Sequence, residues 1–194
     1  MTSFLIIGHT ASTDPSFSLN DLPGKAGRMD LLCRTVSSSL FLSHGIRQNI
    51  ICDILLLGPP YPGRLIRFIG NEIKNLSPDE RNIASFIKIG LAIPAGKTFR
   101  QASQGLYCRK AALADLLAEQ EYAVLDESGT DIRTVPAENI PDAFILSDNR
   151  NYTEEEQSLI AGLTEFSLGP AIVHADHAIT LLLNETDRRK SGWN

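Results

Sequence analysis

The sequence contains only three cysteines, Cys33, Cys52 and Cys108, which stand far apart and form no C-x-x-C pair. An odd number of widely spaced cysteines argues against a disulfide framework and against a zinc site. We therefore expect three buried or half-buried thiols. At 194 residues the chain can bury a hydrophobic core without such cross-links, and we expect one domain spanning residues 1–194.

Long apolar runs are also missing, because no stretch of about twenty apolar residues occurs in the chain. The apolar segment Met1–His9 is too short for a signal peptide and lacks the basic flank and the small-residue cleavage site. We expect a cytoplasmic protein that has no membrane partner.

The sequence motifs of several enzyme classes are absent as well. There is no G-x-x-x-x-G-K-[ST], no G-x-G-x-x-G, no G-x-S-x-G and no H-E-x-x-H, so nucleotide triphosphatase, dinucleotide oxidoreductase and hydrolase functions lose their usual support. His174, Asp176 and His177 form an H-x-D-H pattern that could supply metal ligands. Because Asp176 stands where a helix needs a cap and no other His or Cys cluster is near, we expect a cap and no metal.

Charge is unevenly distributed along the chain, although the net charge is only −5. Residues 61–110 carry nine basic and three acidic side chains, whereas residues 111–194 carry five basic and sixteen acidic ones. A local excess of basic charge favours contact with an anion such as an RNA backbone. The alternative is a solvated charge asymmetry without a partner.

Predicted strands and helices alternate along the chain. Apolar runs predict strands at Ser3–His9, Ile50–Leu57, Arg64–Ile69, Tyr122–Asp126, Ala143–Ser147 and Glu165–Leu168. Helical periodicity and caps predict helices at Arg28–Ser43, Pro78–Ile89, Ala111–Glu119, from Thr153 to near Gly162, and from Asp176 to about Asn184. This alternation predicts an α/β protein with a mostly parallel sheet and helices on both faces.

Local motifs define several boundaries between these elements. Ser77 is predicted to cap its helix in a capping box with Glu80, and Thr153 and Glu156 predict a second box. The strand Tyr122–Asp126 is predicted to end in the turn 127–129, and the polar, glycine-containing segment Phe99–Lys110 to be a loop.

Ligands of open parallel sheets bind beyond the carboxyl ends of the strands. Three such ends stand out, at Leu125-Asp126, Leu146-Ser147-Asp148 and Leu168-Gly169-Pro170. Gly169 would let a ligand approach the backbone and Pro170 would stiffen the loop, although Gly-Pro also simply ends strands. The loop Gly24–Arg28 is either an anion site at a helix start or a connector, and Asp30 is either functional or a partner of the helix dipole.

Several stretches, taken together and in this order, resemble one family. They are Leu22–Arg34 (LPGKAGRMDLLCR), Ser39–Arg47 (SLFLSHGIR), Asn75–Ala84 (NLSPDERNIA), Phe144–Asp148 (FILSD), Thr153–Glu156 (TEEE), Ser167–Pro170 (SLGP) and His174–His177 (HADH). The chain is similar over nearly its whole length to the tRNA pseudouridine N1-methyltransferases of the SPOUT superfamily. Relatives often have His where this chain has Asn149 and Cys where it has Ala178, which leaves the exact acceptor open.

The resemblance implies a C-terminal trefoil knot, one of the rare exceptions to unknotted chains. It also implies that the knot binds S-adenosyl-L-methionine through backbone groups and that a homodimer completes the site. The cofactor residues would be Leu125, Leu146, Ser147, Asp148, Leu168, Gly169, Pro170, Ala171, Ile172, Val173 and Ala178.

The same resemblance implies methyl transfer to N1 of a pseudouridine in tRNA. Asp30 and Arg28 are the candidate base and electrostatic clamp, with Arg67 and Arg81 as further candidates, because the weakly acidic N1–H needs a base or a nearby positive charge. The candidate RNA contacts are Arg64, Arg67, Arg81, Arg109 and Lys110. Two other hypotheses remain open: methyl transfer to a different RNA position, and a non-catalytic RNA-binding or regulatory dimer.

Overall fold

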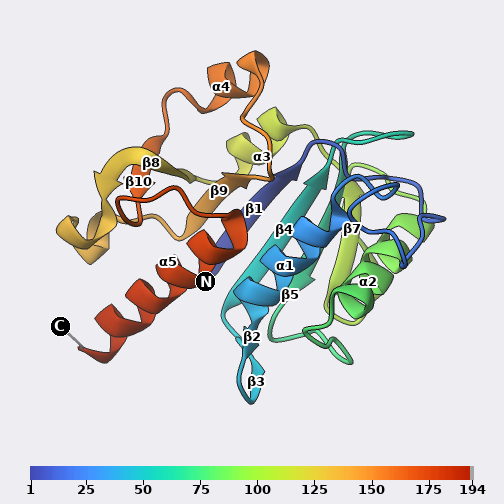
Figure 1. Ribbon diagram of the computed structural model, residues 1–194, viewed down its shortest axis with the longest axis horizontal. Helices are drawn as coiled ribbons and strands as arrows, with labels where there is room; N and C mark the ends of the chain where they lie inside the picture. The colour runs from blue at the N-terminus through green and yellow to red at the C-terminus, as the bar shows by residue number, and fades with distance from the viewer. Residues whose placement is uncertain (193–194) are drawn as a thin grey trace.

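The computed structural model describes residues 1–192 and is built around one eight-stranded sheet (Figure 1). The strands in spatial order are β10 (Thr164–Ser167), β8 (Ala123–Asp131), β9 (Ala143–Ser147), β1 (Thr2–Gly8), β4 (Ile50–Leu56), β5 (Arg64–Ile69), β7 (Leu106–Lys110) and β6 (Arg100–Ser103). Two short strands, β2 (Phe41–Leu42) and β3 (Gly45–Ile46), form a separate hairpin that projects from the body.

The strands from β10 to β4 run parallel, and β5, β7 and β6 continue the sheet in antiparallel pairing. The prediction of a mostly parallel α/β sheet is therefore confirmed. Parallel pairing places the carboxyl ends of β10, β8, β9, β1 and β4 on the same side of the sheet. We call this side the carboxyl edge.

Helices cover both faces of the sheet, as predicted. The helices are α1 (Met29–Leu40), α2 (Glu80–Ala92), α3 (Leu113–Glu119), α4 (Glu154–Ile160) and α5 (Ala175–Ser191), with short 3-10 turns at Ile132–Thr134 and Ala137–Asn139. Strand β1 is buried throughout, and its alternate residues enter two cores: Phe4 and Ile6 pack with α1, α2 and α5, while Leu5 and Ile7 pack with α3 and α4. This alternation follows from the two-residue period of a strand.

The prediction of a loop at Phe99–Lys110 is wrong, because the segment forms the β6–β7 hairpin. Leu106 and Cys108 are buried and alternate with the more exposed Tyr107, which is the pattern of a strand with one covered face. The predicted turn at 127–129 is also wrong, since β8 continues through these residues to Asp131 beside β10.

Two of the three predicted helix caps are wrong. The cap of α2 is Asp79, whose side chain accepts from the backbone N–H of Asn82, and not Ser77. The cap position of α5 is His174, with Asp176 in the first turn, and α5 extends to Ser191, well beyond the predicted end. The third cap, the Thr153–Glu156 box at the start of α4, is confirmed.

The three thiols are buried, as predicted, and none forms a disulfide. Within residues 1–192, none of the helices combines the length and the apolar composition that crossing a bilayer requires.

Candidate active site

A pocket opens at the carboxyl edge between the ends of β8 and β10 and the start of α5. It encloses roughly 390 Å³ of open space, and its lining residues are Leu125, Asp126, Glu127, Phe166, Leu168, Gly169, Ala171, Ile172, Val173, Ala178 and Leu181. We call it the β8–β10 pocket. Its lining is mostly apolar, and Asp126 and Glu127 are its two acidic residues.

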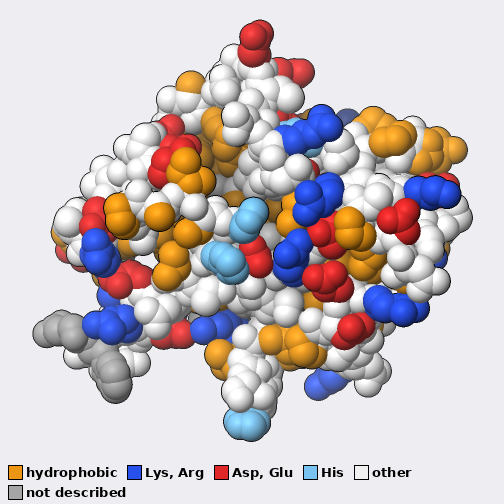
Figure 2. All heavy atoms as spheres, viewed as in Figure 1, with side chains coloured by type: hydrophobic (Ala, Val, Ile, Leu, Met, Phe, Trp, Pro, Cys, Tyr) orange, Lys and Arg blue, Asp and Glu red, His pale blue; other side chains and the backbone are white. Residues whose placement is uncertain are grey.

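Apolar side chains around this pocket reach the surface. Ile172 is 77% exposed, and Val173 and Leu181 are also exposed. Figure 2 shows hydrophobic side chains gathered over the loop between β10 and α5. Exposed apolar clusters of this kind mark surfaces that bind a ligand or a partner, and apolar walls with a few polar groups suit a ring-containing ligand. The acidic residues in the lining would in addition favour a ligand that carries positive charge.

The predicted cofactor residues fall into two groups in the structure. Most of them line the β8–β10 pocket, namely Leu125, Leu168, Gly169, Ala171, Ile172, Val173 and Ala178. Leu146 packs inside the core below it, and the Ser147 hydroxyl donates to the carbonyl of Arg150. Asp148 lines a second, smaller hollow between the starts of α1 and α5, while Pro170 lies on the exposed loop between the two groups.

The second hollow contains roughly 280 Å³ of open space between Leu31 and Thr35 of α1 and His174 and Asp176 at the start of α5. The H-x-D-H pattern therefore lies at the carboxyl edge. His174 is exposed and makes no side-chain capping bond. Among residues 1–192, no group of three His, Cys, Asp or Glu side chains is arranged to hold a metal ion.

His9, at the end of β1, is the centre of a buried ionic cluster. Its Nδ1 lies 2.9 Å from Asp148 Oδ1, its Nε2 lies 2.9 Å from Glu156 Oε2, and its backbone N–H donates to Asp148 Oδ2 at 2.8 Å. The side chains of His9, Asp148 and Glu156 are only 8%, 2% and 9% exposed. The hydrogen bond to Asp148 raises the pKa of His9, with Glu156 adding to the effect against the burial of the ring. Both ring nitrogens of His9 face carboxylate oxygens, a geometry that favours the imidazolium form, and the ring ties β1 to the segment after β9 and to α4.

Arg28 and Asp30 form an ion pair at the start of α1. Arg28 adopts left-handed backbone angles, and its Nε and Nη2 donate to the two carboxylate oxygens of Asp30 at 3.1 and 3.2 Å. Asp30 is buried and also accepts from Arg34 Nη2 at 2.8 Å. Burial acts to raise the pKa of Asp30, but the two guanidinium groups outweigh it and lower the pKa. A carboxylate held in this way is a weak base and a good anchor for Arg28.

The loop Gly24–Arg28 satisfies its own amides. The backbone N–H groups of Gly24 and Lys25 each donate to the carboxylate of Asp21 at 3.1 Å. The Asp21 side chain therefore occupies the position that an external anion would need. Of the two interpretations of this loop, the structure favours the connector.

Three of the predicted RNA contacts are held inside the fold. Arg64 is 8% exposed, and its Nη2 donates to the carbonyls of Gly90, Leu91 and Ile93 at the end of α2. It therefore serves as a side-chain cap for that helix, and the prediction of an RNA contact at Arg64 is wrong for this reason.

Arg67 and Arg109 flank the ring of Phe99, with guanidinium carbons 4.3 and 4.5 Å from its centre. Arg67 donates to Asp53 at 2.8 and 2.6 Å, and Arg109 donates to Glu119 at 2.6 Å. Each guanidinium is thus stacked on Phe99 and paired with a carboxylate of the fold, which makes it poorly available to RNA. We therefore correct the expectation that Arg67 and Arg109 contact RNA, and the further assignment of Arg67 to the clamp. Arg81 and Lys110 are exposed, but Arg81 lies on α2, away from the pockets at the carboxyl edge.

Comparison with known proteins shows the family of this chain. Residues 1–191 match the family model described as "Putative SAM-dependent RNA methyltransferase". The chain belongs to this family. It is also similar to the tRNA (pseudouridine(54)-N(1))-methyltransferase of Methanospirillum hungatei JF-1, at 69% identity over the full length of both chains. The enzyme of the same name from Methanocorpusculum labreanum is 49% identical, covering 97% of this chain and 98% of the relative.

A solved structure with a similar fold is that of Archaeoglobus fulgidus Nep1 bound to S-adenosylhomocysteine. It matches with a TM-score of 0.66 over 98% of this chain and 99% of the other, at 13% identity. This likeness supports the fold. The trefoil knot and the homodimer stay predictions.

Membership of an S-adenosylmethionine-dependent methyltransferase family identifies the ligand chemistry against which the β8–β10 pocket can be compared. The apolar walls suit the adenine ring, and Asp126 and Glu127 suit the positive sulfonium. Neither Glu127 nor Leu181 was predicted, and the role of His9 was missed. His9 is the last residue of the predicted strand Ser3–His9, and Asp148 directly follows the predicted strand Ala143–Ser147. Their places at the ends of two parallel strands were the signal in the sequence that could have brought them together.

Proposed function

We propose that this protein transfers a methyl group from S-adenosylmethionine to N1 of the pseudouridine at position 54 of tRNA. The observation that carries the proposal is the full-length 69% identity to a relative of that name. The β8–β10 pocket at the carboxyl edge supports it, because it offers the donor a site of suitable chemistry. We further propose that the protein acts in the cytoplasm, where it meets its tRNA substrate.

Three groups of residues would have different roles in this reaction. The residues predicted for the cofactor that line the β8–β10 pocket would hold S-adenosylmethionine, which supplies an electrophilic methyl group. Arg28 would stabilise the negative charge that develops when the pseudouridine N1–H loses its proton. Asp30 would orient Arg28 through the bidentate pair and would not accept the proton, because its pKa is lowered.

A homodimer fits the exposed apolar side chains beside the pocket. Ile172 and Leu181 would be covered by a second copy, which would also exclude water from the site of methyl transfer. We propose this arrangement together with the trefoil knot. Light scattering of the purified protein tests the dimer, and a monomer at micromolar concentration would contradict it.

The decisive experiment uses S-adenosylmethionine with a labelled methyl group, unmodified and pseudouridine-containing tRNA, and nucleoside analysis of the product. We expect label in 1-methylpseudouridine only when pseudouridine is present. Label in another nucleoside would support a different acceptor, and cofactor binding without transfer would support the non-catalytic dimer.

The role of Arg28 is tested in the same assay. Arg28→Ala should lower kcat by a factor of about 10² to 10³, the effect expected from removing one group that stabilises a developing charge. Arg133→Ala is a suitable control, because Arg133 is an exposed arginine that also forms an ion pair with an aspartate two residues away. Equal activity of the two variants would show that Arg28 has no part in catalysis.

A further inference from the structure

A wide groove lies between α3 and α4 on the face of the sheet opposite α1. It contains roughly 1500 Å³ of open space, and we call it the α3–α4 groove. Leu57 and His9 form its floor at the ends of β4 and β1, and residues of α3 and of the start of α4 form its walls. The groove therefore opens at the same carboxyl edge as the β8–β10 pocket.

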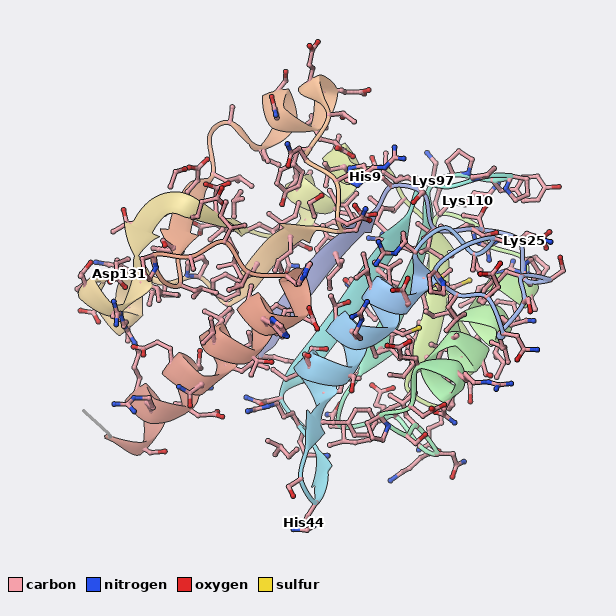
Figure 3. The ribbon with its side chains drawn as sticks, in the orientation of Figure 1. His9, Lys25, His44, Lys97, Lys110 and Asp131 are labelled. Carbon is pink, nitrogen blue, oxygen red and sulfur yellow. The ribbon has the colours of Figure 1, made fainter. Side chains whose placement is uncertain are left out.

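Three cationic side chains surround this groove: Lys97 from the loop before β6, Lys110 from the end of β7 and Arg150 from the loop after β9. His9, Lys97 and Lys110 line the same groove, and Figure 3 shows all three at the same end of the molecule, away from His44. All three cations are exposed, and within the described part of the chain none has a carboxylate within 4.0 Å. Three separate segments thus bring unpaired positive charge to one hollow.

The acidic residues of the groove are largely engaged. Glu156 accepts from His9 and from the backbone N–H of Thr153, and Asp115 accepts from the backbone N–H of Ala112. Glu155 is the remaining carboxylate in the lining, and it is exposed on α4. Asp115 and Glu156 keep their charge but are engaged in hydrogen bonds, whereas no carboxylate of the described residues pairs with the three cations. The cations are therefore the groups of the groove that are available to an anionic ligand.

We propose that the α3–α4 groove binds the phosphate backbone of the RNA next to the target nucleotide, through Lys97, Lys110 and Arg150. This inference rests on the proposed function, which makes RNA the substrate. Phosphate contacts by Lys and Arg position a nucleic acid without reading its sequence. An RNA strand held in the groove would pass over His9 and reach the carboxyl edge, where we propose that the methyl group is transferred. His9 is hydrogen-bonded to Asp148, which borders the second hollow at this edge.

The proposed RNA contacts in the groove differ from those predicted from the sequence. Of the residues predicted from the sequence only Lys110 lies in the groove, while Lys97 and Arg150 were not predicted. Arg150 is held in place because its backbone N–H donates to Asp148 Oδ1 at 2.9 Å. The segment that carries Asp148 therefore also carries a phosphate contact.

The test is the salt dependence of tRNA binding, measured by filter binding for wild type, Lys97→Ala, Lys110→Ala, Arg150→Ala and the triple variant. Each lost phosphate contact should reduce the magnitude of the slope of log affinity against log salt concentration by about 0.7 to 0.9. In the triple variant this slope should be smaller than in wild type by about 2 or more. Lys74→Ala is the matched control, since Lys74 is an exposed lysine in the segment after β5, at the opposite edge of the sheet. Lys74→Ala should keep the wild-type slope.

S-adenosylhomocysteine affinity, measured by calorimetry, should be the same for all five variants and for wild type. Wild-type slopes in the three single variants, or an equal loss in Lys74→Ala, would overturn the proposal. Methyl transfer by the wild type distinguishes a failure of the groove proposal from a failure of the proposed function. Transfer to pseudouridine with unchanged slopes refutes the groove alone. Reduced slopes without any transfer refute the proposed function and leave the groove as an RNA site.

Discussion

Replacement of His9 by alanine would leave two buried carboxylates facing each other without the cation between them. Asp148 and Glu156 each lie 2.9 Å from the His9 ring and are almost completely shielded from water. Removing one partner from a buried ionic contact costs about 3 to 5 kcal/mol. For a domain of this size about 1 kcal/mol corresponds to about 2 to 4 °C in Tm, so we expect His9→Ala to lower the Tm by roughly 10 °C at pH 6.

The size of this effect should depend on pH. The pKa of His9 is raised above 6.5, so its stabilising contribution is complete below pH 6.5 and is lost as the pH rises through the raised pKa. The pKa of Glu156 is lowered from 4.5 because its hydrogen bonds with Thr153 and His9 outweigh the opposing effect of burial. Its contribution is therefore present above pH 4.5 and lost at lower pH. The difference in Tm between wild type and His9→Ala should be largest between pH 4.5 and pH 6.5 and should become smaller toward pH 9.

Thermal unfolding followed by circular dichroism at pH 5.5, 7 and 9 measures this difference. His44→Ala is the control, because His44 lies at the exposed tip of the β2–β3 hairpin and should leave the Tm unchanged at every pH (Figure 3). A Tm difference for His9→Ala that stays constant from pH 5.5 to pH 9 would refute the assignment of His9 as an imidazolium.

Three further predictions concern local structure. Thr153→Ala should reduce the free energy of unfolding by about 1 kcal/mol in urea, because the Thr153 hydroxyl accepts from the N–H of Glu156; an unchanged value would contradict the capping role. Gly27→Ala should cost more than about 1 kcal/mol in the same assay, because Gly27 has a φ of 68° and an added Cβ would overlap the carbonyl of Thr10; a neutral effect would contradict this backbone geometry. Cys33 and Cys52 should resist an aromatic disulfide reagent at pH 8 until urea is added, because burial raises their pKa, to about 12 for Cys52; rapid labelling of the folded protein would argue against this burial.

Elements with a strong local pattern could be predicted from the sequence. The strand Ala143–Ser147 and the Thr153–Glu156 box appear where they were predicted, because a short apolar run and a capping motif each specify their own backbone. Asp79 was missed as a cap because Ser77 and Asp79 are both good capping residues two positions apart, and Asn82 decides between them by donating its N–H to Asp79. The β6–β7 hairpin was missed because an edge strand that is half exposed has a mostly polar sequence.

The candidate site was predictable where it depends on strand ends and not where it depends on side-chain partners. The loops around Leu125 and Leu168 were predicted because ligands of parallel sheets bind beyond the strands. The ionic cluster of His9 joins residues that are 139 and 147 positions apart, and no local pattern reports such a contact. A count of charges also cannot separate Arg64, which is buried and donates through Nη2 to the end of α2, from Lys110, which is exposed.

Strand β10 and helix α5 follow all the other elements in the chain, yet they form one wall of the β8–β10 pocket and cover part of α1 (Figure 1). The part of α1 that faces α5 is therefore covered only after the final helix has been synthesised, whereas its contacts with β1, β4 and α2 can form earlier. If the donor binds in the β8–β10 pocket as we propose, a chain that ends before α5 lacks part of the wall of this site, and donor binding then requires the complete C-terminal helix.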